Sequence, residues 1–319
     1  MIRPAMSPIA STCEPPAVPG WAIQRGPMTS DAEAAFMAGA ALHALDTLVR
    51  YEPAWAGAWR QRLALKCAAA AVRLAGRAED EAALRDAWHL RSPGDDPGPS
   101  GNILGAWRQL ASRPPVVDAK RLAEVVEWLG LRWDDGFADL PEAIDDLVRS
   151  GRPAPFAAAT IASRVVALWP GAEVLAWWCA DFLVAQKLRW AKPVPLLMAQ
   201  AFAPAFRTGD GRGKRIRPGE QKEFEGAVCL ALVRGADDAL QLASELSRRA
   251  ERLAEVMPRL RAKGAGDVVK RLLDDDAVAG SLTTKSLSRF GARRLFERLQ
   301  TFEAVRELSG RDSFRLFGL

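Results

Sequence analysis

The chain has 319 residues, of which 49% are hydrophobic and 26% are charged, and its formal net charge is +5. This composition excludes an intrinsically disordered protein, and the length allows about two or three domains. No uncharged stretch approaches the roughly 20 residues that a membrane span requires, so we expect a cytoplasmic protein with no membrane partner. The four cysteines, Cys13, Cys67, Cys179 and Cys229, show no paired spacing, which is typical of a reducing compartment.

Residues 1–29 contain many prolines and lack the continuous apolar centre of a secretion signal, so they predict a flexible N-terminal tail. An all-helical body follows over residues 30–206. Its first helix begins at Ser30, which forms a capping box with Glu33, and prolines and glycines separate the later helices. No alternating pattern typical of strands occurs before residue 300. The fold class is therefore mainly α, a multi-helix body followed by a small C-terminal module.

Residues 207–219 are rich in glycine and basic side chains and predict a mobile linker. A helical hairpin is expected over 220–263, with its two helices separated at Arg234 and Gly235. All 11 tryptophans lie between Trp21 and Trp190. Lys and Arg outnumber Asp and Glu by 23 to 17 from Arg207 onward, whereas the counts before it are 21 and 22. A basic excess confined to one part of the chain favours an anionic partner.

The remaining residues, 264–319, predict a winged-helix-like module with one β-hairpin. Residues 267–273 supply a helix, and a polar bend at 281–286 is where a second short helix would lead into a third. The third helix has the sequence SRFGARRLFERLQTF and gathers one apolar face from Ala292, Leu295, Phe296, Leu299 and Phe302. Two short runs, 305–308 and 313–317, are joined by turn-forming residues 309–312 and predict the hairpin.

The opposite face of this third helix is basic, and Ser288 is well placed to cap its first turn. A recognition helix needs cations that reach phosphates while its first turn reaches base edges. Arg289, Arg293, Arg294 and Arg311 would hold phosphates, and Ser286, Ser288 and Arg289 would touch bases. The full set of candidate DNA-binding residues is Lys285, Ser286, Ser288, Arg289, Arg293, Arg294, Arg298, Arg311 and Arg315. The alternative for Arg293, Arg294 and Arg298 is ordinary solvated surface.

A catalytic site has one candidate, where Arg85, Asp86, His89, Asp95 and Asp96 fall close together in the sequence. The two loop acids could face a metal or a substrate, but they are more typical of a turn. A metal site would also need a further histidine or acidic cluster, and only His43 remains elsewhere. No phosphate-binding loop, nucleotide fingerprint or nucleophile elbow occurs. We therefore predict no enzyme, no cofactor and no metal.

Three stretches carry a resemblance to a known family. They are ALRDAWHLRSPGDDPGPSGNILGAWRQLA, PRLRAKGAGDVVKRLL, and the ending with ARRLFERL and AVRELSGRDSFRLFGL. Together they resemble the family called domain of unknown function 1403, known from alphaproteobacteria, over nearly the whole chain from about Ala34. The family has no established activity, so the resemblance implies no chemistry. The final segment is also similar in architecture to the winged-helix ends of bacterial regulators.

The function expected from these features is binding of double-stranded DNA, as a regulator or as an accessory to replicon maintenance. The alternative is a helical adaptor whose terminal module docks a protein partner, and an enzyme is the third possibility. Homodimerisation is also open. Fold alone does not decide among these functions.

Overall fold

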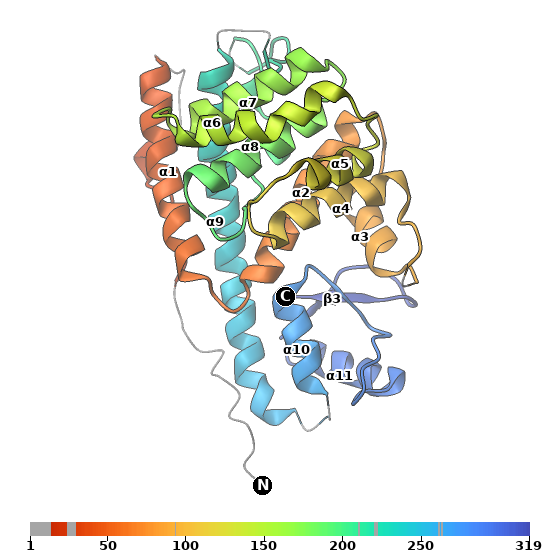
Figure 1. The fold of residues 1–319 in the computed structure, drawn as a ribbon. Coiled ribbons are helices and arrows are strands. Elements are labelled where there is room, and N and C mark those ends of the chain that lie inside the picture. The colour runs from red at the N-terminus through yellow and green to blue at the C-terminus, as the bar shows by residue number, and fades with distance from the viewer. Residues whose placement is uncertain are drawn as a thin grey trace. The chain divides into compact units, whose positions relative to one another are not determined.

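The computed structural model describes residues 14–23, 30–92, 94–209, 211–219, 223–260, 262 and 264–319 (Figure 1). Most of the predicted N-terminal tail and Cys13 lie outside these residues. Of that tail, residues 14–23 are described and contain a short helical turn with Ala22 buried. The described part of the chain is mainly helical, with a small antiparallel sheet near the C-terminus, which confirms the predicted fold class.

The elements follow one another in this order, with 3-10 helices written η: η1 (Gly20–Ala22), α1 (Asp31–Tyr51), α2 (Ala56–Leu74), α3 (Glu81–His89), α4 (Gly98–Ser112), α5 (Ala119–Trp128), η2 (Asp135–Asp139), α6 (Leu140–Arg149), α7 (Ala154–Leu168), α8 (Glu173–Lys187), η3 (Met198–Gln200), η4 (Pro204–Phe206), α9 (Phe224–Val256), η5 (Met257–Arg259), α10 (Ala265–Asp274), β1 (Val278–Ala279), α11 (Arg289–Thr301), β2 (Arg306–Glu307) and β3 (Leu316–Gly318).

The chain packs as two compact units. The helical unit comprises residues 16–50 and 60–240, and the C-terminal unit comprises residues 51–59 and 241–319 together with residues 14 and 15. One boundary between them falls inside α2 and another falls inside α9. The predicted division differs, because it placed the boundary at the 207–219 segment. It also missed that nine residues from the N-terminal part of the chain, Tyr51–Trp59, complete the C-terminal unit.

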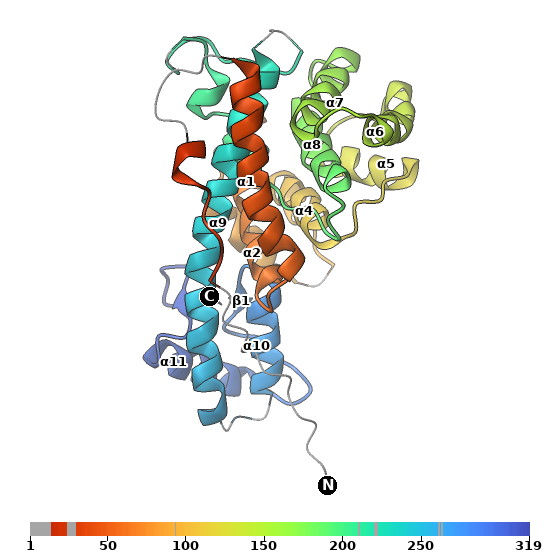
Figure 2. The same cartoon turned by 90° about the vertical axis from the view of Figure 1, so that its left-hand side faces the viewer.

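Within the helical unit, α7 and α8 pack against each other, and α4 and α6 also contact α8 (Figure 2). α8 is buried along most of its length, including the adjacent Trp177 and Trp178. The Nε1–H of Trp178 donates to the Ala106 carbonyl at 3.2 Å, so this buried indole has its hydrogen-bond partner. The two tryptophans therefore fill the space between packed helices, as their positions in the sequence indicate.

α1 lies beside the part of α9 that belongs to the helical unit (Figures 1 and 2). A Cβ at Gly226 would approach Asp31 Oδ1 to 2.5 Å, so the glycine permits close contact between the two helix starts. Among the described helices, α1 is long and apolar enough to cross a membrane by length and composition alone. A core helix of a soluble protein has the same features, and Ala38, Leu45 and Leu48 of α1 are buried.

The predicted hairpin of two helices over 220–263 is instead one helix, α9, which continues through Arg234 and Gly235. Glycine inside a helix costs about 1 kcal/mol relative to alanine, which is not enough to break a helix held by packing. Gly235 has a packing role, since a Cβ there would lie 3.2 Å from Leu196 Cβ. The glycine thus marks a close approach rather than a helix end.

The described residues of the 207–219 segment form a hydrogen-bonded loop of the helical unit. Arg207 and Arg215 make an antiparallel bridge, and Ile216 N–H donates to the Phe206 carbonyl at 2.8 Å. The Arg215 guanidinium forms a two-pronged ion pair with Glu173, at the start of α8, and both side chains are largely buried. This long-range partner explains why a segment with the composition of a linker is folded.

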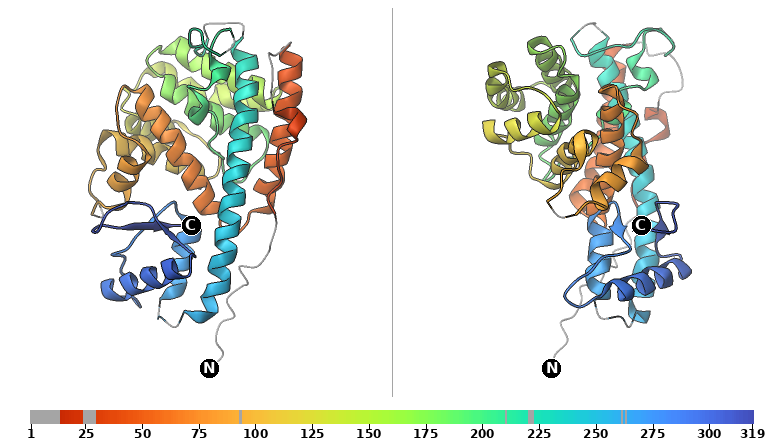
Figure 3. Two further views of the ribbon diagram at one scale, coloured as in Figure 1. Left: turned by 180° about the vertical axis from the view of Figure 1, so that it is seen from behind. Right: turned by 90° about the vertical axis from the view of Figure 1, so that its right-hand side faces the viewer.

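The C-terminal unit contains the sheet, whose strand order is β1-β3-β2 with both pairings antiparallel. Phe317 of β3 lies in register with Val278 on one side and Glu307 on the other. α11 lies beside this sheet (Figure 3), and its predicted apolar residues Ala292, Leu295, Phe296 and Leu299 are buried. The two flanking strands are only two residues long, so β3 and the helix hold the sheet together.

The predicted polar bend at 281–286 is present as turns, but the second short helix expected to lead into α11 is absent from the described residues 275–288. Thr284 and Leu287 make an isolated bridge, and Thr284 Oγ1 accepts from Ser286 N–H at 3.3 Å. Serine and threonine hydroxyls compete with helical hydrogen bonds in this way, which accounts for the difference. Strand β1 was not predicted, because two residues cannot show an alternating pattern.

Candidate nucleic-acid interface

α11 begins where the sequence predicts. Ser288 has an extended backbone conformation, and its Oγ accepts from Gly291 N–H at 3.2 Å, which is the hydrogen bond of an N-cap. The cap orients the first turn, which carries Arg289 and Phe290. The backbone position of this first turn is therefore determined by a local hydrogen bond together with the packing of the helix on the sheet.

The face of α11 opposite the sheet is basic and exposed, as predicted. Arg293 forms an exposed ion pair with Glu297 at 3.0 Å on the same helix, and the Arg298 guanidinium lies 5.6 Å from the Phe302 ring centroid. Arg289 and Arg294 make no hydrogen bond or ion pair with any residue that the structure describes. An exposed pair one turn apart is worth well under 1 kcal/mol, so Arg293 is readily released to an anionic ligand.

The connection between β2 and β3 is shaped by one carboxylate. Glu307 Oε1 accepts from Ser309 Oγ at 2.8 Å and from Arg311 N–H at 3.2 Å, and Oε2 pairs with Arg315 Nη2 at 2.9 Å. Ser309 Oγ also accepts from Leu316 N–H at 3.1 Å. Although burial acts to raise the pKa of Glu307, these hydrogen bonds together hold that pKa below its usual value. These side-chain hydrogen bonds reinforce the backbone pairing of β2 with β3, in which Leu308 N–H also donates to the Leu316 carbonyl at 2.8 Å.

Arg315 was predicted as a DNA contact, but its guanidinium is engaged within the unit. Nη2 donates to Gln300 Oε1 at 2.9 Å in addition to its pair with Glu307, and the group lies 5.0 Å from the Phe317 ring centroid. Its side chain is only 29% exposed. Arg315 therefore joins the hairpin to α11, whereas Arg311 is exposed beside the turn at Gly310.

The two remaining predicted residues precede the helix. Ser286 is exposed but held in place, since its Oγ donates to Asp267 Oδ2 of α10 at 3.3 Å. Lys285 is exposed and has no ion pair within the described part of the chain. Both lie in the turn that leads into α11, so the unit brings the predicted cations to one helix, its preceding turn and the neighbouring hairpin.

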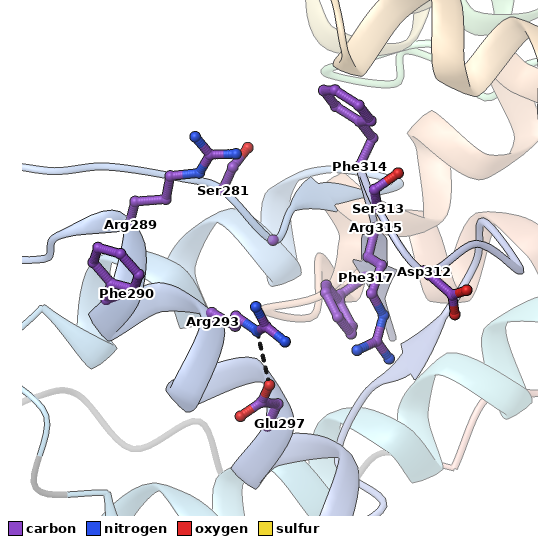
Figure 4. A pocket seen from close by; sticks show the side chains of 11 residues that line it. Ser281, Arg289, Phe290, Arg293, Glu297, Asp312, Ser313, Phe314, Arg315 and Phe317 are labelled. Atoms are coloured by element: carbon purple, nitrogen blue, oxygen red, sulfur yellow. Dashed lines mark hydrogen bonds and ion pairs between the residues drawn. The ribbon is translucent and has the colours of Figure 1, made fainter.

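A groove of about 430 Å³ lies between α11 and the hairpin (Figure 4). Phe290 on the helix side is 79% exposed and Phe314 on the hairpin side is 67% exposed. The groove is lined by Gly280, Ser281, Arg289, Phe290, Arg293, Glu297, Asp312, Ser313, Phe314, Arg315 and Phe317. In the sequence, Phe290 falls opposite the apolar face of the helix, and an alternating strand over 313–317 would place Phe314 on the same side as the buried Leu316.

Phe314 is exposed because the strand does not extend to it. Its φ is +54°, in the left-handed region, and β3 begins two residues later at Leu316. An L-residue with a large side chain adopts this conformation at a cost of about 1–2 kcal/mol. No strand alternation applies at such a position, so the periodicity of the sequence could not locate this side chain.

Two acids of the catalytic candidate, Asp95 and Asp96, make structural hydrogen bonds in the helical unit. Asp95 Oδ2 accepts from Ser92 N–H at 3.2 Å, and Asp96 Oδ1 accepts from Gly98 N–H and Asn102 Nδ2, at 2.9 and 3.1 Å. These are turn and helix-start hydrogen bonds. Over the described ranges, no group of three or more His, Cys, Asp or Glu side chains is arranged to hold a metal ion.

The comparison with known families agrees with the sequence motifs. The model described as "Protein of unknown function (DUF1403)" matches residues 7–319. The chain belongs to the DUF1403 family. Because the match covers nearly the whole chain, both the helical unit and the C-terminal unit are parts of DUF1403. A comparison with curated proteins finds no match.

Proposed function

We propose that the C-terminal unit binds duplex DNA, with α11 as the recognition helix and the β2–β3 hairpin as the wing. The observation that carries the proposal is the exposed basic face of α11, on which Arg289 and Arg294 have no protein partner among the described residues. Arg289, Arg293 and Arg294 lie within two turns of α11, which matches the spacing that contacts to DNA phosphates along a groove require. Such a protein would act in the cytoplasm, where bacterial DNA lies.

The order of elements supports this proposal. α10, β1, α11, β2 and β3 follow one another, with a turn at 281–288 in place of a second helix. A sheet ordered β1-β3-β2, with the β2–β3 hairpin following α11 in the chain, is the order that a winged helix would have, and it supports the proposal. Arg311 then stands where a wing contacts the flanking backbone.

Charge supports the proposal as well. From Ser281 to Leu319 the sequence has eight Lys and Arg residues against four Asp and Glu residues. Two of these acids, Glu297 and Glu307, are paired with arginines inside the unit. Arg289, Arg294 and Lys285, which make no such pair within the described part of the chain, therefore provide an excess of positive charge at the surface.

The test is DNA affinity as a function of salt concentration, using the full chain. The affinity should fall steeply with salt, and Arg289→Ala with Arg294→Ala should reduce the slope by up to about 0.9 for each phosphate that is no longer neutralised. Arg132→Ala, an exposed arginine of the helical unit, is the matched control and should leave the slope unchanged. An affinity that does not depend on salt, or a slope that the double variant does not alter, would reject the proposal.

The alternative function is a helical adaptor whose terminal module docks a protein. It is favoured by a different observation, the exposure of Phe290 and Phe314, since large exposed aromatics are typical of protein interfaces. A stable complex with a protein partner that depends on Phe290 but not on Arg294, together with no binding of duplex DNA, would support the adaptor instead.

A further inference from the structure

The groove between α11 and the hairpin has the dimensions of a ligand site. Its volume of about 430 Å³ falls in the range of small-molecule pockets, roughly 300–1,000 Å³. Phe290 borders it from the first turn of α11 and Phe314 from the hairpin (Figure 4). Both rings are mostly exposed to solvent, so neither contributes the packing that usually explains a phenylalanine.

The conformation of Phe314 is held by its surroundings rather than by its own side chain. The Glu307 and Ser309 hydrogen bonds close the hairpin on either side of the position, and the left-handed backbone then directs the ring outward. Strained residues that persist because their neighbours determine them cluster at ligand sites. A ring presented in this way, with no structural benefit, is suited to contact a ligand.

The charged groups of the groove narrow the class of ligand. Arg289 offers a cationic donor and Asp312 a carboxylate acceptor, and the exposed ion pair of Arg293 with Glu297 adds one group of each kind. An aliphatic side chain from a protein partner would form no hydrogen bond or ion pair with these cationic and carboxylate groups. A nucleobase has two flat faces for stacking and an edge that carries both donors and acceptors, and its phosphate suits a guanidinium. This set of residues therefore fits a nucleotide.

Within a duplex, the faces of a base are covered by its neighbours, and a phenyl ring can stack only on a base that has left the helix or was never paired. We propose that the groove receives one unpaired nucleobase next to the duplex held by α11, with the base stacked on Phe314 and Phe290 beside it. This inference rests on the proposed function and names its substrate class, a duplex with a single-stranded extension or an extruded base.

The experiment compares binding of the full chain to a blunt duplex and to the same duplex with a short single-stranded extension that carries 2-aminopurine at its first unpaired position. We expect preference for the extended DNA by about tenfold, the contribution of one stacked base, and quenching of the 2-aminopurine fluorescence. Phe314→Ala should remove the preference and the quenching while leaving the salt dependence for blunt duplex unchanged. Phe314→Tyr should retain both.

Two further variants make the result specific. Phe290→Ala should reduce the quenching, and Phe36→Ala, which removes a similarly exposed phenylalanine of the helical unit, should change nothing. Equal affinity for the two DNAs, or an equal loss of affinity for both in Phe314→Ala, would overturn the inference while leaving duplex binding intact. An absence of salt-dependent duplex binding would instead overturn the proposed function, so the two failures are distinguishable.

Discussion

The ring of Phe296, on α11, is stacked on the ring of Phe317, on β3, with centroids 4.5 Å apart and planes 9° from parallel. This contact joins the helix that carries the exposed arginines to the central strand of the sheet. Both rings are buried. The basic face and the hairpin are therefore held by the same packed pair, and their mutual orientation depends on it.

Truncation of this pair should destabilise the C-terminal unit. Phe296→Ala removes a fully buried ring, and substitutions of this kind cost about 3–5 kcal/mol. The expected result is faster hydrogen exchange of the α11 and β3 amides, because the stacking that links the helix to the strand is gone. Phe302→Ala, at the half-buried end of the helix, should have a much smaller effect. Equal protection in the two variants would show that the stacked pair does not hold the unit.

A second prediction concerns Gly57, from the segment that joins the C-terminal unit early in the sequence. A Cβ at Gly57 would lie 2.7 Å from Asp274 Cα and 2.8 Å from its carbonyl oxygen, at the end of α10. Backbone atoms cannot rotate away, so Gly57→Ala should lower the free energy of unfolding. Gly266→Ala, inside α10 with open space at its Cβ, should raise it by up to about 1 kcal/mol. Thermal or denaturant unfolding of the full chain would show these opposite signs.

The third prediction concerns the hairpin at low pH. The pKa of Glu307 is below its usual value in the folded protein, so its stabilising effect is present above the usual value and is lost as pH falls through the lower folded value. Protonation should therefore loosen the hairpin in acid, and Glu307→Gln should loosen it at neutral pH. Hydrogen exchange at Arg311 and Leu316, whose amides donate within the network, measures this loosening. Glu303→Gln, an exposed acid of the same unit, is the control.

The fourth prediction places a pH dependence in the helical unit. Burial raises the pKa of Asp181 to about 7, and backbone hydrogen bonds from Leu197 and Leu196 offset this only in part. A carboxyl with a raised folded pKa contributes most stability below its unfolded pKa, and the contribution declines as pH rises through the folded value.

The free energy of unfolding should therefore fall between about pH 4 and about pH 7, and Asp181→Asn, which cannot ionise, should flatten this fall. Asp145→Asn, at an exposed site, serves as the control and should keep the wild-type profile. Parallel profiles for all three proteins would show that Asp181 does not titrate in this range.

Local features of the site could be predicted from the sequence. The cap at Ser288 and the two faces of α11 depend on neighbouring residues along one helix, so periodicity located them correctly. The turn before β3 could be predicted from Gly310 and the polar residues beside it. The fold class is also local in origin, because glycines, prolines and capping residues mark the helix ends.

Features that depend on distant partners could not be predicted. The pairing of β1 with β3 joins residues nearly forty positions apart, and the ion pair of Arg215 with Glu173 orders a loop that has the composition of a linker. Gly235 resembles a helix break until the neighbouring Leu196 is known. The exposure of the Phe314 ring depends on the left-handed backbone conformation of that one residue, which no pattern of hydrophobicity encodes.

The position of β3 in the sheet has a consequence for synthesis of the protein. β3 lies between β1 and β2 although it is the last of the three to be translated, and Tyr51–Trp59 belongs to the same unit as residues beyond 241. On the ribosome, the nascent C-terminal unit therefore lacks its middle strand until residues 316–318 have left the exit tunnel. The surface around α11 is therefore completed only after β3 has been made, so a chain that stops before β3 would lack it.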